Sequence, residues 1–245
     1  MKTAMRVWDV NPGYLNRQSL LGEHREIHAI FVINAENKKG YARHPETLRW
    51  QAHLSALTRR HDLVVSEMLL RGYRHHSPIN TPPARSWPGE FIDVPGRQFD
   101  ILKKKYENRE PGRIPLAQRT QQLWSQHKYS VLARDPEYYG QIGQRLAKAG
   151  NDISFEELAL ELTKMLRTHP SEGRLMNALY HMWGYVSPLA RPMGSEILED
   201  PVALMAAIRE LAMKHQVKYL LGSTALNDLH IWVSASPQSN DRSVP

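Results

Sequence analysis

The feature that most constrains the fold is a helical spacing of apolar residues, which recurs along the chain without any alternating strand pattern of useful length. Leu20, Ile27 and Phe31 follow this spacing and predict a helix from about residue 15 to 34. A second periodic stretch covers 45–71, and Gly72 is placed to end it in a left-handed conformation. The chain is therefore predicted to be all-α.

A stretch rich in proline and glycine, 77–115, interrupts this pattern. We expect it to be a loop or linker with a single helical turn near 98–107, and we expect helix to resume at Pro115. The later helix starts carry capping residues: Asp135-Pro136, with Gly150 closing that helix, then Ser154 with Glu157, and Asp200-Pro201. The twelve residues from Ser234 look frayed. We predict two helical parts, 1–112 and 113–245, joined by the proline-rich segment.

Composition excludes several classes of protein. The 245 residues, 41% of them hydrophobic, are enough to bury a core. The absence of cysteine excludes disulfides, a thiol nucleophile and cysteine-held metal clusters. No apolar run is long enough to cross a bilayer, and the N-terminal residues do not resemble a signal peptide. We therefore expect a cytoplasmic protein that does not bind a membrane.

The net charge of +7 and the pI of about 9.6 favour a polyanionic partner, nucleic acid before an anionic membrane. Many soluble proteins without such a partner are also mildly basic, so charge alone does not decide the question. The basic residues are spread along the chain and do not form a tail.

The most concentrated group of charges lies in RQSLLGEHREIH, residues 17–28. Glu23 and Glu26 are neighbours on one helix face. Arg25 lies beside them, and arginine binds phosphate in a bidentate way, while a carboxylate can act as acid, base or cation stabiliser. Gly22 lowers helix stability but allows a ligand or another backbone to approach. The alternative is a solvated helix face with internal salt bridges.

His24 and His28 have the i, i+4 spacing of metal ligands. The sequence offers no evident third ligand and no HExxH motif. We therefore expect no metal and no cofactor.

Residues 6–31, RVWDVNPGYLNRQSLLGEHREIHAIF, resemble the N-terminal segment of the phage T4 type of pyrimidine-dimer DNA glycosylases. The shared pattern is an early arginine, then leucine, glutamine and L-x-x-E-x-R-E. Further similarity lies in GYARHPET at 40–47, LLRGY at 69–73 and RGYRHHSP at 71–78. The resemblance covers about the first hundred residues. It implies an all-helical enzyme that cuts the glycosidic bond of a damaged pyrimidine and then nicks the strand as a lyase.

The resemblance also implies roles for particular residues. Glu26 takes the place of the essential glutamate, which stabilises positive charge on the sugar and moves protons. The nucleophile is the α-amine of the mature N-terminus, which falls at Met5 if the mature chain begins there. Otherwise the α-amine of Met1 or the ε-amine of Lys2 would have to fold back into the site. Arg25 takes the place of a phosphate-binding arginine. The remaining predicted substrate contacts are Arg6, Gln18, Ser19, Glu23 and His28, with Ser19 standing where the phage enzyme has histidine.

The second half, from about residue 113 to 188, is similar to the YbgA-like helical domain of unknown function, which is thought to help hold RNA. The matching positions include Asn177, His181 and Tyr185. A buried polar pair that bonds helix ends is the alternative for Asn177 and His181. Aromatic residues of this half could stack on bases or belong to the core: Trp124, Tyr129, Tyr138 and Tyr139.

From these observations we predict a DNA glycosylase with AP-lyase activity that acts on a damaged or modified pyrimidine in double-stranded DNA, or on RNA, as a monomer. The rival is a non-catalytic nucleic-acid-binding or RNA-modification accessory protein. A helical protein with no nucleic-acid role is a third reading.

Overall fold

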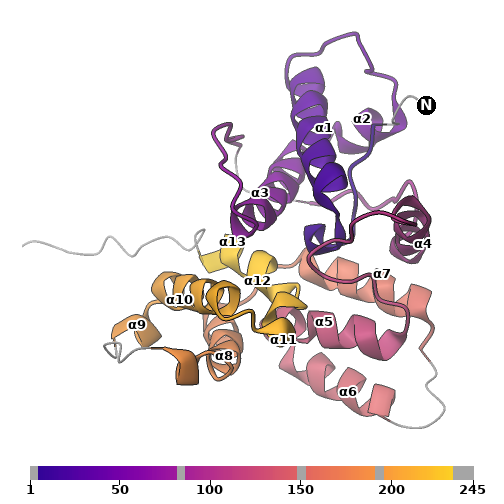
Figure 1. Cartoon of the computed structure of the whole chain (residues 1–245). Coiled ribbons are helices and arrows are strands. Elements are labelled where there is room, and N and C mark those ends of the chain that lie inside the picture. The colour runs from indigo at the N-terminus through magenta and orange to yellow at the C-terminus, as the bar shows by residue number, and fades with distance from the viewer. Residues whose placement is uncertain (1–4, 82–85, 148–152, 191–195, 234–245) are drawn as a thin grey trace, which may run out of the picture.

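A computed structural model of the chain describes residues 5–81, 86–147, 153–190 and 196–233 (Figure 1). These residues form helices and turns and contain no strand, which confirms the all-α prediction. Gly150 and the C-terminal residues from Ser234 lie outside the described ranges. The helices are, in order, η1 Pro12–Tyr14, α1 Arg17–Ala35, α2 Pro45–Trp50, α3 Leu54–Leu70, α4 Pro95–Lys105, α5 Thr120–Leu132, α6 Pro136–Ala147, α7 Phe155–Leu166, α8 Glu172–Trp183, η2 Ser187–Leu189, α9 Glu196–Glu199, α10 Pro201–Lys214, α11 Lys218–Leu221, α12 Ala225–Asp228 and α13 His230–Val233.

Several predicted helix ends are confirmed by their capping contacts. The helix predicted from about residue 15 begins with a cap that was not predicted: the Asn16 side chain accepts a hydrogen bond from the Ser19 N–H at 2.9 Å at the start of α1. Ser154 and Glu157 form the expected capping box of α7, and Asp200 caps α10. Gly72 follows α3 with φ of +80°, which is the left-handed conformation expected there.

The prediction of one long helix over 45–71 is wrong, because the chain turns at residues 51–53 between α2 and α3. No glycine or proline marks this break, and the apolar spacing is compatible with either arrangement. The turn allows Trp50 to be buried with its ring 6.2 Å from that of Trp87, while α3 packs along α1. Tertiary packing therefore decides the break.

The linker prediction also needs correction. In place of a single turn, α4 is an 11-residue helix that begins at Pro95, and Phe99 and Leu102 on its inner face are buried. Helix resumes at Thr120 and not at Pro115. The many prolines of this segment predicted a loop, but proline at the first helical position is compatible with the start of a helix, as at Pro95.

The two predicted parts share a hydrophobic core. Leu20 and Ile27 of α1 belong to the same buried cluster as Leu123 of α5 and Leu158 of α7. In Figure 1, α12 and α13, near the C-terminal end of the described chain, lie against α3. The domain boundary at 112/113 remains a prediction, but the helices on its two sides are packed together.

Candidate functional site

The extended residues 5–10, called here the N-terminal strap, are fixed by side chains from other elements. The Val7 and Trp8 N–H groups donate to Glu46 of α2 at 3.2 Å and to Glu23 of α1 at 3.0 Å. The Asp9 N–H donates to Gln98 of α4 at 2.8 Å. Burial raises the pKa of the Glu46 carboxyl to about 7, against the opposing effects of Arg49 and the Val7 N–H. Three helices therefore set the path of the strap.

The strap, α1 and the end of α4 enclose an open pocket of about 610 Å³. Most of the residues predicted as catalytic or substrate-binding lie in this one place. Its lining is Arg6, Trp8, Gln18, Ser19, Gly22, Glu23, Arg25, Glu26, Ala29, Lys105 and Arg109. Apart from its chain neighbours and the backbone of its own helix, no described atom lies within 4 Å of the position that a Cβ would take at Gly22, so this glycine leaves space on the pocket wall.

Glu23 forms the floor of the pocket and is 1% exposed. Arg60 of α3 binds both of its carboxylate oxygens, at 2.8 and 3.0 Å, and also donates to the Val10 carbonyl at 2.9 Å. Burial raises the pKa of Glu23, while Arg60 and the Trp8 N–H counter this by favouring the ionised form. Glu23 thus joins α1, α3 and the strap, and its oxygens are occupied by protein groups.

Glu26 lies one turn further along α1 and is half-buried. Its carboxylate makes no hydrogen bond or ion pair with the described residues, which leaves it available to a ligand. Burial raises the pKa of Glu26, and the nearby charges of Arg25 and His44 oppose this shift. A carboxylate with a raised pKa beside cations can both stabilise developing positive charge and exchange protons.

Four cationic side chains line the pocket: Arg6, Arg25, Lys105 and Arg109. Arg6 lies with its guanidinium carbon 4.3 Å from the Trp8 ring centre and pairs with Asp93, while Arg109 donates to Gln18 at 3.3 Å. Burial, then Arg109 and Arg6, lower the pKa of the Lys105 ammonium. Lys105 and Arg109 were not predicted as site residues, because the proline-rich segment that carries them was expected to be a loop or linker with a single helical turn.

Met5 opens the strap, and its side chain packs against the main core and accepts a hydrogen bond from Thr47 at 3.6 Å. Met1, the alternative source of the nucleophilic amine, lies outside the described residues. Lys38, on the loop after α1, pairs with Glu36 and does not line the pocket.

His28 does not line the pocket with Glu26. It belongs to a separate cluster with His24 of α1, His61 of α3 and His75, and the nearest ring nitrogens of all four lie within 4.8 Å of one another. Burial, followed by the neighbouring histidines, lowers the pKa of His24 to about 4, and the pKa values of His28 and His75 are also lowered. Sequence reasoning found only the i, i+4 pair, since His61 and His75 are distant in sequence.

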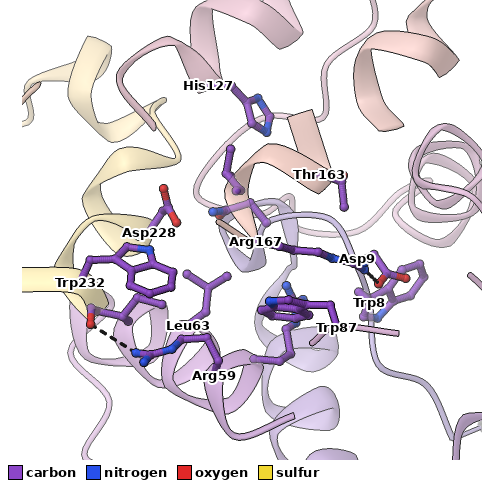
Figure 2. A pocket seen from close by; sticks show the side chains of 14 residues that line it. Trp8, Asp9, Arg59, Leu63, Trp87, His127, Thr163, Arg167, Asp228 and Trp232 are labelled. Atoms are coloured by element: carbon purple, nitrogen blue, oxygen red, sulfur yellow. Dashed lines mark hydrogen bonds and ion pairs between the residues drawn. The ribbon is translucent and has the colours of Figure 1, made fainter. Parts of the chain in front are cut away.

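A second cavity lies where the two parts meet (Figure 2). Figure 2 shows Arg167 extending from the end of α7 towards Asp9 of the strap, and the two form an ion pair at 2.5 Å. Arg49 of α2 binds the same Asp9 oxygen. The cavity has a volume of about 30 Å³, and the two ion pairs of Asp9 beside it connect the strap to α2 and to the end of α7.

In the second part, Asn177 and His181 of α8 and the following Tyr185 are exposed. The interpretation of Asn177 and His181 as a buried pair is therefore wrong. Tyr185 stacks on Tyr219 with ring centres 4.7 Å apart, and the Lys128 ammonium lies 4.8 Å from the Tyr219 ring. The other aromatics are divided: Tyr129 is buried, while Trp124, Tyr138 and Tyr139 are partly buried against core residues.

The pocket residues of the strap and α1 all fall within one family match. Residues 5–81 match the pyrimidine dimer DNA glycosylase family. The matched residues 5–81 include Glu26, Arg25 and the four clustered histidines, but end before Lys105 and Arg109. Residues 128–229 match a family described as a protein of unknown function, DUF1722. Both matches agree with the two resemblances read from the sequence.

Comparisons with curated proteins and with solved structures found no match. Among the described helices, none is both long enough and apolar enough to span a bilayer.

Proposed function

We propose that the chain is a DNA glycosylase with AP-lyase activity that removes a damaged or modified pyrimidine from double-stranded DNA. One observation carries the proposal: the Glu26 carboxylate, without a protein partner among the described residues, shares a pocket with four cationic side chains. The family match over residues 5–81 supports the same activity. The cations suit the phosphates on either side of a displaced nucleotide, since arginine and lysine neutralise DNA phosphates.

The chemistry requires a neutral amine in the pocket. The amine attacks the sugar C1′, the C1′–N bond breaks, and the base leaves with the bonding electrons and takes a proton. Ring opening gives a protonated imine. Loss of a C2′ proton then expels the 3′ phosphate, and water hydrolyses the imine and returns the amine. Glu26 stabilises the positive charge on the sugar and carries protons in these steps.

Besides the N-terminal amines of a chain that begins at Met1, which lies outside the described residues, two amines are candidates for this role. The α-amine of Met5, in a chain that begins there, would lie at the edge of the pocket, and an α-amine has a pKa near 8, so a useful fraction is neutral at pH 7. The Lys105 ε-amine lines the pocket, and its pKa is lowered by burial and by Arg109 and Arg6. We favour the α-amine because the register of Arg6, Gln18 and Glu26 matches the family pattern.

Borohydride trapping tests the proposal, because reduction of the imine fixes the protein to DNA covalently. Duplexes with a cyclobutane dimer, other damaged pyrimidines or an abasic site are incubated with chains that begin at Met1 or at Met5. We expect trapping on at least one duplex, with the Met5 chain at least as efficient. Mass spectrometry of the trapped peptide, with the N-terminus of each protein verified, then identifies the amine.

Lys105→Gln, compared with Lys104→Gln on the exposed neighbouring position of α4, distinguishes the two amines. If the α-amine is the nucleophile, both variants still trap and Lys105→Gln binds DNA more weakly. Loss of trapping in Lys105→Gln alone, with the adduct mapped to Lys105 in the parent protein, would assign the reaction to the lysine. Base release without trapping on any duplex would contradict the lyase step. The absence of both base release and trapping would contradict the proposal that the chain is an enzyme.

The exposed side chains of the second part favour a second candidate role, an accessory surface that holds nucleic acid. Tyr185, stacked on Tyr219 beside Lys128, presents an aromatic face next to a positive charge, and such faces stack on unpaired bases. Replacement of Tyr185 by alanine should weaken binding to single-stranded DNA or RNA. Replacement of Tyr41, an exposed tyrosine of the first part, serves as the control. If the catalytic tests fail while this binding persists, the chain acts as a non-catalytic nucleic-acid-binding or RNA-modification accessory protein.

A further inference from the structure

Four imidazoles from three segments converge on one point beside α1. His24 and His28 come from successive turns of α1, His61 from α3, and His75 from the segment that follows α3. Their ring centres lie 4.6 to 5.2 Å apart in five of the pairs, and the nearest ring nitrogens of all four are within 4.8 Å of one another. All four members of the group therefore come from α1, α3 and the segment after α3.

His61 gives an independent indication of a ligand. Its side chain is 2% exposed, and neither ring nitrogen has a hydrogen-bond partner. A carboxylate oxygen of Asp62 lies 3.7 Å from Nδ1, which is too long for a hydrogen bond. A buried polar atom without a partner costs about 1–3 kcal/mol, so proteins rarely keep one without a ligand or water.

We propose that His24, His28, His61 and His75 bind one divalent transition-metal ion, with Zn²⁺ as the first candidate. Neutral imidazole suits zinc, copper, nickel and iron, whereas magnesium and calcium require oxygen ligands. The Nε2 atoms of His24 and His28 are 3.3 Å apart. Two ligands of a tetrahedral zinc site, with Zn–N bonds of about 2.0–2.1 Å, are separated by about 3.3 Å. The two ring nitrogens that are farthest apart, at up to 4.8 Å, would have to approach each other by about 1.5 Å to reach this spacing.

The surroundings of the cluster fit a bound cation. The carboxylate of Asp62 faces His61 Nδ1, and carboxylates commonly orient metal-binding histidines from this side. The Ser77 hydroxyl lies 3.4 Å from Nε2 of both His28 and His75 and covers the cluster from the exposed side. Without an ion, the cluster would rest on these long contacts between neutral groups.

The proposed ion is structural and lies away from the catalytic pocket. At 100° per residue, Glu26 lies about 160° around α1 from both His24 and His28, so the cluster and the pocket occupy opposite sides of the helix. The ion would tie α1 to α3 and to the segment that carries His75. The ion therefore stabilises α1, the helix that carries Glu26, and does not contact the pocket in which the DNA would react.

Metal binding can be measured on the full chain after treatment with a chelator. Addition of Co²⁺ should produce the visible absorption of a tetrahedral site at a stoichiometry of one ion per chain, Zn²⁺ should displace it, and Zn²⁺ should raise the unfolding temperature. His75→Gln, at the half-buried ligand on the segment after α3, should weaken Co²⁺ binding at least about tenfold. His76→Gln, the adjacent exposed histidine outside the cluster, should bind like the parent protein.

His61→Asn provides a second variant at the buried ligand, and circular dichroism verifies its fold. The proposal is overturned if the parent protein gives no tetrahedral Co²⁺ spectrum and no Zn²⁺ effect on unfolding. It is also overturned if His75→Gln and His61→Asn both retain the parent affinity, because the ion would then bind elsewhere. None of these outcomes depends on whether the chain cleaves DNA.

Discussion

Arg113 binds both carboxylate oxygens of Glu67, with Nε 3.0 Å from Oε1 and Nη2 2.7 Å from Oε2. Glu67 is fully buried in α3, Arg113 belongs to the segment before α5, and the Asn227 amide of α12 donates to the same carboxylate at 2.8 Å. One carboxylate therefore connects the first part, the linker and the C-terminal helices. Burial alone would raise the pKa of Glu67, but Arg113 and Arg71 outweigh it and hold the pKa below its ordinary value.

Glu67→Gln should lower the free energy of unfolding by about 3–5 kcal/mol, because it leaves the buried charges of Arg113 and Arg71 without their partner. Since the folded pKa is lowered, the contribution of Glu67 is complete above its ordinary pKa near 4.5 and is lost as the pH falls through the folded pKa. Urea unfolding at pH 7 and pH 3 measures both effects. Glu210→Gln, on the exposed face of α10, is the matched control, and an equal loss in the two variants would contradict the assignment.

Glu23 and Glu26, three residues apart, should respond oppositely to the same substitution. Glu23→Gln breaks a buried bidentate pair with Arg60 and should cost about 3–5 kcal/mol of stability. Glu26→Gln should change stability by no more than about 0.5 kcal/mol, keep DNA binding and abolish base release. Denaturant titration and a single-turnover excision assay on each variant separate the two roles. Native excision by Glu26→Gln would exclude Glu26 as the catalytic carboxylate.

Glu46 should make stability depend on pH in the opposite sense to Glu67. Its folded pKa is raised to about 7 from an ordinary 4.5, so its contribution is complete below about pH 4.5 and is lost as the pH rises through about 7. The charges that face it are those of Arg49, Asp9 and Arg6. When the pH is raised from 5 to 8, the free energy of unfolding should therefore fall less in Glu46→Gln than in the parent protein. Unfolding midpoints at the two values test this, with the exposed Glu107→Gln as control.

DNA binding should weaken steeply with salt, because each neutralised phosphate contributes about 0.9 to the slope of log affinity against log salt. Arg109→Gln in the pocket should reduce that slope by about 1 and weaken binding to all sequences alike. Lys214→Gln, an exposed cation of α10, should leave the slope unchanged. Fluorescence anisotropy on a labelled duplex over a range of salt provides the measurement. A flat response of the parent protein would contradict an electrostatic interface.

The sequence by itself determined the features that depend on neighbours along the chain. The apolar spacing predicted the all-α class, Ser154 and Asp200 were predicted as caps and confirmed, and Gly72 ended α3 as expected. The residues quoted from 6–31 were sufficient to recognise the family and to select Glu26. These are short-range properties, because a helix, its cap and a motif on one of its faces are set within a few turns of chain.

Tertiary structure decided what depends on distant residues meeting. Glu23 and Glu26 both line the pocket, and only tertiary packing gives them different roles. Arg60 binds both carboxylate oxygens of Glu23, whereas the Glu26 carboxylate remains available to a ligand. Packing also brings Lys105 into the pocket and His61 and His75 beside His24 and His28. A pattern in the sequence does not specify these contacts, because burial and pairing depend on how helices that are far apart in the sequence pack against one another.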